Sequence, residues 1–469
     1  MRPTKIICTL GPATESIDMI RALTEAGMDA VRLNFSHGTH EGHKKAVEAV
    51  RKVEEEIGRP IGIIADLAGP KIRVKDIPGG TLQLNEGETI RLTGSATKDP
   101  GFLAINYPHL AREAKPGERV FISDGTIELK ITKIDGDEIT AIVKNGGEIM
   151  PGKGVNLPDT SLSIDSITEK DREDIAFCLG LGIDWAALSF VRSADDIVKI
   201  KEIIVKAGKD IPVIAKIEKT EALTNIASIL EVSDGILVAR GDLGVETPLE
   251  QVPLVQKILI RLANEVGKPV IVATHMLESM IHEKRPTRAE ASDVANAVID
   301  GSDALLLSGE TAMGKYPIEA AATMAKIANT AKDGLHSEDW ESAVEKYREE
   351  SVTHAVCHAA YHTAKDLNAA VIVTPTSTGT TPRMVARYKP KQPIVALSPK
   401  IDTIRRLTIS FNIFPRLVKF NDNMDDLIKT AKEEAVKSGF VESGDIAVIT
   451  AGFPPGVAGT TNLIRVEVI

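Results

Sequence analysis

The sequence predicts an α/β protein built on a closed (β/α)8 barrel, with an inserted antiparallel β-barrel domain and a second α/β domain at the C-terminal end. Strand-like and helix-like segments alternate through residues 1–70 and again through 166–335. Residues 71–165 instead carry closely spaced turn signals between alternating runs, which is typical of antiparallel strands. Residues 336–469 open with a charged stretch and then return to the α/β alternation, which indicates a further sheet.

The barrel prediction depends on counting strands across the insertion. Each expected strand is a short apolar run followed by a segment with helical spacing, and these strands lie within residues 4–12, 30–38, 60–70, 185–192, 211–219, 235–243, 268–280 and 302–314. Eight parallel strands close a TIM barrel, and the span without the insertion is close to the roughly 250 residues typical of that fold. An open doubly wound sheet is the alternative, but the glycine-rich turn usual after its first strand is missing.

Three helix starts can be predicted from capping signals. The SITE run at residues 166–169 and the TRAE run at residues 287–290 have the spacing of a capping box. Thr381 precedes Pro382 after a hydroxyl-rich loop, so we expect Thr381 to be the N-cap of a helix that begins with the proline.

Composition limits the class of protein. A chain of 469 residues is too long for one ordinary core. Aromatic residues make up only 4%, so the core must be built from aliphatic side chains, as in parallel sheets. The formal net charge of −10 argues against general binding of nucleic acid or of anionic membranes. The three widely separated cysteines are expected to be reduced core residues of a cytoplasmic protein, and no apolar run approaches the roughly 18 residues that span a bilayer.

Polar residues collect where the expected strands end. Lys216 and Glu218 stand two residues apart, as do Arg240 and Asp242, so we expect each pair to project from one face of its strand. Strand ends of one direction form one rim of a parallel barrel, where active sites of this fold lie. The residues expected at this rim are Arg32, Asn34, Ser36, His37, Asp66, Lys71, Arg73, Lys216, Glu218, Arg240, Gly241, Asp242, Thr274, His275, Ser308 and Glu310.

The residue types at this rim suggest a chemistry. Glu218 and Asp242 offer the hard oxygen ligands that Mg²⁺ prefers, and no histidine and cysteine cluster suggests zinc. Arg32, Arg73 and Lys216 would surround the metal with positive charge, which suits a phosphoryl group during transfer. An internal ion pair without catalytic function is the structural alternative.

Seven motifs fall in the order found in one enzyme family: RLNFSHG, GPKIR, VIAKIEK, LVARGDLGVE, ATHMLESM, RPTRAEASDVANAV and LLLSGETA. The chain resembles pyruvate kinases over essentially its full length. The resemblance implies transfer of phosphate from phosphoenolpyruvate to ADP, giving pyruvate and ATP, with Mg²⁺ or Mn²⁺ as cofactor. It also implies a cytoplasmic homotetramer in which the insertion covers the barrel mouth as a lid that excludes water.

The resemblance further implies a role for individual residues. Glu218 and Asp242 would bind the divalent metal, Lys216 would stabilise the transferring phosphoryl group, and Arg32 would contact the substrate phosphate. Thr274 and Ser308 are candidates to organise a water chain that protonates the enolate; the alternative is that they are simple hydrogen-bonding residues of the rim. The remaining implied contacts are Gly241, Asp242 and Thr274 with the substrate, and Asn34, His37, Arg73 and Lys153 with the nucleotide.

One departure from the family concerns potassium. Many members hold a monovalent cation with the equivalents of Asn34, Ser36 and Asp66 and the backbone carbonyl of Leu67, and carry a glutamate where this chain has Lys71. A lysine ammonium can supply the charge that potassium brings. We therefore expect that K⁺ is not required.

In the C-terminal domain, the resemblance implies a site for a phosphorylated allosteric effector between residues 376–381 and the glycine-rich run 451–462. The loop residues concerned are Thr376, Ser377, Thr378, Gly379, Thr380 and Thr381. An ordinary βα turn is the alternative.

Two other functions fit parts of the sequence. The same barrel and metal could serve a carbon–carbon lyase that stabilises an enolate. A catalytically silent metabolite sensor is the other, but Lys216 and Asp242, whose loss would mark it, are both present.

Overall fold

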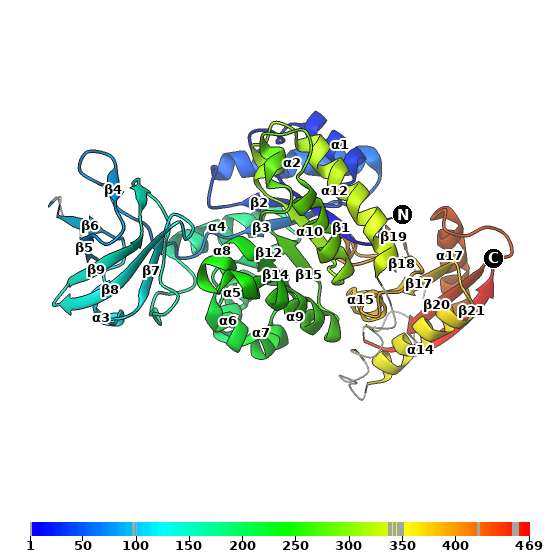
Figure 1. Ribbon diagram of the computed structural model, residues 1–469. Helices are drawn as coiled ribbons and strands as arrows, with labels where there is room; N and C mark the ends of the chain where they lie inside the picture. The colour runs from blue at the N-terminus through cyan, green and yellow to red at the C-terminus, as the bar shows by residue number, and fades with distance from the viewer. Residues whose placement is uncertain are drawn as a thin grey trace.

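The computed structural model describes residues 2–95, 99, 101–335, 340, 344, 351–419, 423–452 and 459–469. Figure 1 shows three parts in a row, with the inserted β domain at one end, the barrel in the middle and the C-terminal domain at the other end. The domain limits predicted at residues 70, 165 and 335 remain predictions. Among the described residues, no helix is both long and apolar enough to span a bilayer.

The predicted barrel is confirmed. Its eight strands close in the order β1-β16-β15-β14-β13-β12-β3-β2, and every neighbouring pair is parallel. The strands are β1 (Lys5–Thr9), β2 (Ala30–Asn34), β3 (Gly62–Asp66), β12 (Trp185–Leu188), β13 (Val213–Ile217), β14 (Gly235–Ala239), β15 (Val270–Ala273) and β16 (Ala304–Leu307). All eight lie within the predicted segments.

Helices cover the outside of this barrel and bury its larger core. They are α1 (Ile17–Ala26), α2 (His40–Ile57), α4 (Glu169–Leu181), α5 (Ala194–Lys206), α6 (Thr220–Thr224), α7 (Ile226–Val232), α8 (Arg240–Glu246), α9 (Val252–Glu265), α10 (Arg288–Ile299), α11 (Gly309–Ala312) and α12 (Pro317–Ala331). A smaller cluster of buried side chains, which includes Ile64, Trp185 and Leu306, fills the barrel interior. The interior is therefore a packed core, and a reacting molecule can be accommodated only at a barrel end.

The insertion forms a six-stranded sheet in the order β11-β7-β8-β9-β5-β6 and a two-stranded sheet of β10 and β4. Its strands are β4 (Leu82–Leu84), β5 (Thr89–Thr93), β6 (Phe102–Ala104), β7 (Arg119–Ile122), β8 (Ile127–Asp135), β9 (Glu138–Asn145), β10 (Gly147–Ile149) and β11 (Val155–Asn156), with the short helix α3 (Leu110–Glu113). The pairs are antiparallel, as predicted, except for β5 and β6, which run parallel.

The C-terminal domain has a five-stranded sheet in the order β19-β18-β17-β20-β21, parallel except for β20 and β21. Its elements are α14 (Val352–Asp366), β17 (Val371–Pro375), α15 (Thr380–Ala386), β18 (Ile394–Ser398), α16 (Ile401–Arg406), β19 (Ile413–Leu417), α17 (Met424–Lys437), β20 (Ile446–Gly452) and β21 (Thr461–Val468). Trp185 at the start of β12 donates to the Arg406 carbonyl at 3.2 Å and so ties this domain to the amino end of the barrel.

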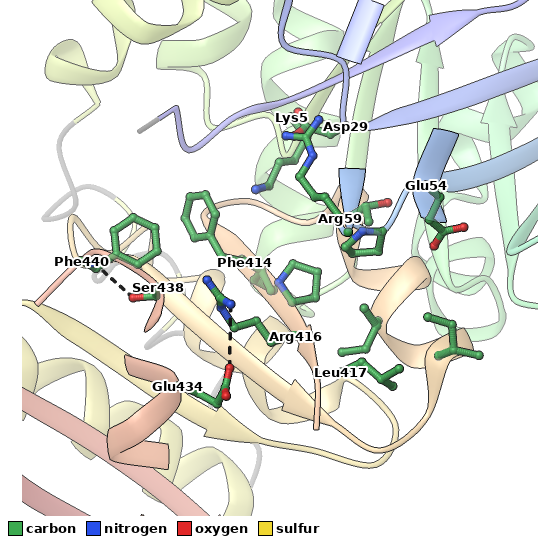
Figure 2. A pocket seen from close by; sticks show the side chains of 17 residues that line it. Lys5, Asp29, Glu54, Arg59, Phe414, Arg416, Leu417, Glu434, Ser438 and Phe440 are labelled. Carbon is green, nitrogen blue, oxygen red and sulfur yellow. Dashed lines mark hydrogen bonds and ion pairs between the residues drawn. The ribbon is translucent and has the colours of Figure 1, made fainter. Parts of the chain in front are cut away.

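A cavity of about 560 Å³ lies at this junction (Figure 2). The Lys5 ammonium lies 4.2 Å from the centre of the Phe414 ring, and the Arg405 guanidinium crosses the junction to Glu54 at 2.8 Å. The junction is therefore held by charged and aromatic groups as well as by apolar packing.

One of the three predicted helix starts is right. Thr287 and Glu290 form the capping box of α10. Ser166 does not cap α4, because Thr168 and Asp171 form the capping box there and Ser166 is buried. The third prediction is also wrong: Gly379 is the N-cap and α15 begins at Thr380, two residues earlier than expected.

Candidate active site

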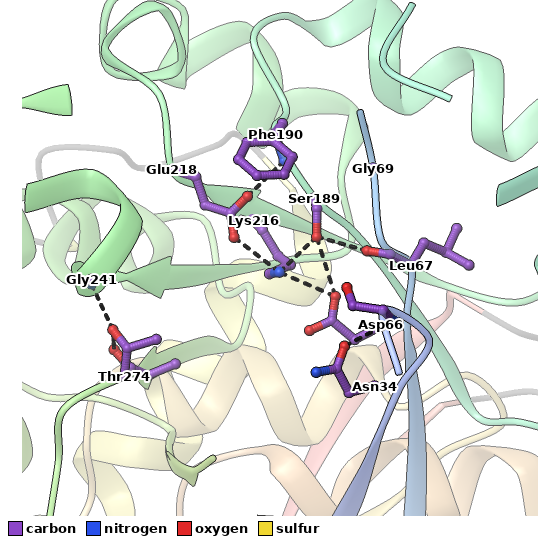
Figure 3. A network of polar contacts seen from close by, with 12 residues as sticks. Asn34, Asp66, Leu67, Gly69, Ser189, Phe190, Lys216, Glu218, Gly241 and Thr274 are labelled. Carbon is purple, nitrogen blue, oxygen red and sulfur yellow. Dashed lines mark hydrogen bonds and ion pairs between the residues drawn. The ribbon is translucent and has the colours of Figure 1, made fainter. Parts of the chain in front are cut away.

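The carboxyl end of the barrel holds a buried lysine between two carboxylates. Lys216 Nζ lies 2.9 Å from Glu218 Oε1 and 3.2 Å from Asp66 Oδ1, and it donates to Ser189 Oγ at 2.6 Å (Figure 3). Strands β13, β3 and β12 carry these groups side by side, because β12 pairs with both of the others. The predicted pairing of Lys216 and Glu218 on one face is thus confirmed.

Arg32 completes this charge network from the second strand. Its Nε donates to Asp66 Oδ2 at 2.6 Å, and Asn34 stands directly opposite Asp66 in the β2–β3 register. Burial alone would raise the pKa of Asp66, but the charges of Lys216 and Arg32 outweigh it and hold that pKa below its ordinary value. Asp66 therefore keeps its negative charge at neutral pH.

The lysine and the glutamate respond to burial in opposite ways. Burial would lower the pKa of Lys216, but Asp66 and Glu218 raise it above its ordinary value, so the ammonium stays charged. For Glu218, burial raises the pKa, the neighbouring Asp242 charge adds to this, and Lys216 only partly offsets it. A further cation beside Glu218 and Asp242 would lower the pKa of Glu218 and so favour its charged form.

These two carboxylates fit a divalent metal ion. Both line a cavity of about 80 Å³, together with Arg32, Lys216 and Thr274. Within the described part of the chain, the Asp242 carboxylate makes no hydrogen bond or ion pair, and no three His, Cys, Asp or Glu side chains are grouped as ligands. Two carboxylates, with the remaining positions left for substrate oxygens and water, are the coordination that Mg²⁺ prefers.

Strained backbone marks the same mouth. Phe190 and Thr274 have φ angles of 56° and 70°, although neither is glycine and Thr274 is β-branched. At Phe190 this conformation accompanies an N–H that donates to Glu218 Oε2 at 2.8 Å. Thr274 Oγ1 accepts from the Gly241 N–H at 2.7 Å, so the backbone group at the start of α8 is already paired. Such outliers cluster at functional sites, because the surrounding structure must hold them.

The predicted pairing of Arg240 with Asp242 on one strand face is wrong. Strand β14 ends at Ala239, so both residues lie in the first turn of α8. The Arg240 guanidinium reaches Asp293 on α10 at 2.6 Å and donates to the Thr274 carbonyl at 2.8 Å. Arg240 therefore braces the mouth from outside, whereas Asp242 lines the cavity.

A second cavity, of about 850 Å³, lies between the insertion and the barrel. It contains the predicted nucleotide residues His37, Arg73 and Lys153. Lys71, Phe190 and Asp242 line both cavities, so the two adjoin. The Arg73 guanidinium donates to the Gly152 carbonyl at 2.7 Å, within the insertion. Asn34, predicted for both nucleotide and cation, lies only in the smaller cavity.

The residues predicted for a monovalent cation lie together only in part. Asn34, Ser36 and Asp66 line the smaller cavity beside Lys71. The Leu67 carbonyl accepts from Ser189 Oγ at 2.7 Å. Lys71 is exposed and its Nζ lies 6.0 Å from the centre of the Phe190 ring.

Two further rim residues have different surroundings. Ser308 lines the smaller cavity, as predicted. Glu310 is buried, and its oxygens accept from the backbone N–H groups of Leu277 and Ser308 at 3.0 and 2.8 Å. Glu310 therefore shapes the turn after β16.

The predicted effector loop is a compact turn ahead of α15. Gly379, with a φ of 84°, is the N-cap, so Thr381 is not. Thr376 Oγ1 accepts from the Gly379 N–H at 2.9 Å, and Thr381 Oγ1 meets Thr461 Oγ1 at 2.7 Å. Ser377, Thr378 and Thr380 complete the loop, with the two threonines exposed. Half of the partner run predicted at 451–462, residues 453–458, lies outside the described residues.

Ser189 was missed by the sequence reasoning, although it contacts Lys216 directly. The signal was present, because Ser189 follows the apolar run of the fourth strand as the other rim residues follow theirs. The Phe190 N–H was also missed, and no sequence signal predicts its positive φ.

The closed barrel and its cationic mouth, where Asp242 is left free to take a metal, define the class as a phosphotransferase. Comparison with known proteins gives the particular family. The family model described as "Pyruvate kinase, barrel domain" matches residues 1–321, and "Pyruvate kinase, alpha/beta domain" matches residues 354–467. The chain belongs to the pyruvate kinase family, whose members generally need a divalent metal ion.

Relatives from several bacteria match along the whole chain. It is 45% identical to the pyruvate kinase of Geobacillus stearothermophilus, 44% to pyruvate kinase 2 of Synechocystis sp. and 43% to the pyruvate kinase of Sporosarcina psychrophila. Each alignment covers 100% of this chain and between 79% and 81% of the relative. The function is accordingly that of a pyruvate kinase.

Proposed function

We propose that this chain transfers the phosphoryl group of phosphoenolpyruvate to ADP at the barrel mouth, giving pyruvate and ATP. The observation that carries the proposal is the Lys216 ammonium, fixed by Asp66, Glu218 and Ser189 beside the open carboxylate of Asp242. Formation of ATP from phosphoenolpyruvate and ADP, followed in a coupled assay, is the test. An enolate lyase would consume its substrate without forming ATP.

We assign the metal to Glu218 and Asp242. A divalent ion, Mg²⁺ or Mn²⁺, would act there as a Lewis acid toward phosphoryl oxygens. Their exposure to one small cavity supports the assignment, as does the raised pKa of Glu218, which burial and the Asp242 charge cause. Binding of Mn²⁺, measured by electron paramagnetic resonance without substrate, should weaken in Asp242→Asn.

Lys216 and Arg32 are proposed to hold the phosphoryl group. Because Lys216 stays charged and fixed in place, it can stabilise negative charge as that charge develops, with little reorganisation. Gly241 and Thr274 would seat the substrate carboxylate, which requires the Gly241 N–H to exchange its present bond to Thr274 for one to the substrate. Water held near Thr274 and Ser308 would protonate the enolate, because a hydroxyl alone is a poor acid.

The nucleotide is proposed to lie in the larger cavity, against His37, Arg73 and Lys153. Arg73 and Lys153, both on the insertion, line this cavity together with Asp242 of the barrel. Closure of the insertion would exclude water that competes for the phosphoryl group. Lys153→Ala should raise the KM for ADP more than the KM for phosphoenolpyruvate.

We also propose that catalysis does not require K⁺, because Lys71 supplies the positive charge. Its position beside Asn34, Ser36 and Asp66 in the smaller cavity supports this. Turnover in buffer free of K⁺ should equal turnover with K⁺, and Lys71→Glu should create a K⁺ requirement. Lys130→Glu, at an exposed lysine of β8, is the control. Strong K⁺ stimulation of the parent enzyme would contradict the proposal.

The remaining proposals rest on kinship with the family. They are a homotetramer, a cytoplasmic location and a phosphorylated effector bound at residues 376–381. The exposed hydroxyls of Thr378 and Thr380, which lie 3.0 Å apart, support the effector site. Assays with a panel of sugar phosphates and nucleotides would identify the effector and its sign.

A further inference from the structure

A buried carboxylate joins the insertion to the barrel mouth. Glu246, at the end of α8, has a side chain only 1% exposed. Its Oε1 accepts from Asn156 Nδ2 on β11 of the insertion at 2.8 Å and lies 2.6 Å from Lys219 Nζ. One oxygen atom thus receives donors from two different parts of the protein.

The segments that meet at Glu246 each carry part of the proposed active site. Lys219 directly follows Glu218, and Thr220 next to it donates to the Glu246 carbonyl at 3.1 Å. Glu246 closes the seven-residue helix that opens with Arg240 and contains Asp242. Asn156 lies three residues beyond Lys153, and both line the larger cavity.

The two carboxylate oxygens of Glu246 are used unequally. Oε2 is buried and, within the described chain, has no hydrogen-bond partner. Leaving a buried carboxylate oxygen unpaired costs roughly 1–3 kcal/mol, so a residue kept only for stability would be expected to satisfy both. The neighbouring Val245 packs near the insertion as well, since a Cβ added to Gly125 would lie 3.5 Å from its Cγ1. Helix α8 is therefore the surface on which the insertion rests.

We infer that Glu246 is a positioning residue, which sets the distance between the nucleotide face of the insertion and the metal carboxylates of the barrel. Glu246 positions the insertion through Asn156, and it positions the metal carboxylates through Lys219 and α8. Glu246 also neutralises Lys219, so that this ammonium on the cavity wall does not compete with Lys153 and Arg73 for the nucleotide. The inference rests on the nucleotide placement proposed above.

The test is a charge exchange across the hydrogen bond. Asn156→Ala removes the link and should raise the KM for ADP about threefold, while Asn156→Asp places two carboxylates together and should raise it about tenfold. In both variants kcat and the KM for phosphoenolpyruvate should stay within about twofold, and Mn²⁺ affinity without nucleotide should be unchanged. The double variant Asn156→Asp/Glu246→Gln restores one carboxylate and one amide, and should return the KM for ADP to within about twofold of the parent.

A matched control comes from another buried carboxylate of the barrel. Asp300 accepts from Gln256 Nε2 at 2.9 Å and pairs with Lys257, away from the insertion. Asp300→Asn should lower thermal stability without changing the KM for ADP.

Three outcomes would overturn the inference: an unchanged KM for ADP in both Asn156 variants, a uniform loss of all kinetic parameters, or a charge exchange no better than Asn156→Asp alone. The variant Lys153→Ala distinguishes failure of the proposed nucleotide site from failure of the positioning role. If it raises the KM for ADP while the Asn156 variants do not, the nucleotide site stands and the positioning role fails.

Discussion

The two ends of the barrel use acidic residues in opposite ways. At the amino end, Asp29, Asp184, Asp234 and Asp303 each precede a strand and accept from the first residues of a neighbouring strand: the N–H groups of Ile6, Ile63, Val213 and Val270, at 2.8 to 3.1 Å. At the carboxyl end, the carboxylate of Asp242 makes no such bond within the described residues and faces a cavity instead. The amino-end carboxylates hold the barrel closed, and Asp242 is available to a metal or substrate, whereas Asp66 and Glu218 at the same end are already paired with Lys216.

The arrangement at the amino end repeats along the sheet. The four aspartates precede β2, β12, β14 and β16, and their carboxylates accept from N–H groups of β1, β3, β13 and β15. Asp303 also accepts from the Phe411 N–H at 2.9 Å, so the same carboxylate also binds a backbone N–H of the C-terminal domain. In a barrel of this kind, residues at the amino end are expected to serve stability and those at the other end catalysis.

The largest effect on catalysis is expected from Lys216→Met at the carboxyl end. We expect kcat to fall by about 10³-fold, because a fixed positive charge at the phosphoryl site is lost. Substrate affinity, measured by equilibrium binding, should change little. Lys389→Met, at a fully buried lysine 3.5 Å from Asp303, is the matched control at the amino end and should leave kcat unchanged. Near-normal turnover in Lys216→Met would refute its role.

Asp184→Ala should have the reverse effect. Asp184 Oδ2 accepts from the Ile63 N–H at 2.8 Å and from Arg51 at 2.7 Å, so the change leaves a strand N–H and a guanidinium without their acceptor. We expect a loss of about 3 kcal/mol in the free energy of unfolding, measured by urea denaturation, with kcat per folded molecule unchanged. A fall in kcat without loss of stability would contradict the division of labour between the two ends.

The amino end should also give a pH dependence. Burial lowers the pKa of Lys5 to about 8, although Asp29 partly offsets this, and Arg2 and Arg59 add to the lowering. Because the unfolded chain then binds more protons than the folded one, stability should rise with pH, by about 2 kcal/mol between about pH 7.5 and pH 9.5. The rise should be clearly smaller in Lys5→Met, where only other lysines with a pKa lowered by burial, such as Lys268 and Lys389, still contribute. The free energy of unfolding is measured by urea denaturation at each pH. An equal dependence on pH in the parent and in Lys5→Met would contradict the role of Lys5.

The smallest effect is expected at Ser189, which joins Lys216 Nζ to the Leu67 carbonyl. Ser189→Ala should lower kcat about tenfold, because one hydrogen bond that orients the ammonium is lost. Ser302→Ala is the control, since its hydroxyl is buried at the amino end and donates to Ala297. Equal kinetics in both variants would show that Lys216 needs no such support.

Particular residues show how far the sequence could lead. Lys216 and Glu218 were predicted as a pair because they lie two residues apart at a strand end, and period-two geometry holds there. The same rule failed at Arg240 and Asp242, because β14 ends at Ala239 and the chain turns into a helix. The rule for N-caps failed at Thr381, because a glycine with positive φ, Gly379, caps α15 two residues earlier. At both of these places the chain passes from a strand into a helix.

The order of apolar runs determined the eight-stranded barrel, since a parallel strand buried on both faces has a composition that a reader can recognise. Residue types at the strand ends determined which chemistry could occur. Only the tertiary structure decided which carboxylates are saturated, that Ser189 and the Phe190 N–H complete the lysine site, and that Glu246 meets Asn156 across 90 positions of chain. These contacts depend on distances between separate elements, and no local pattern of residues encodes such distances.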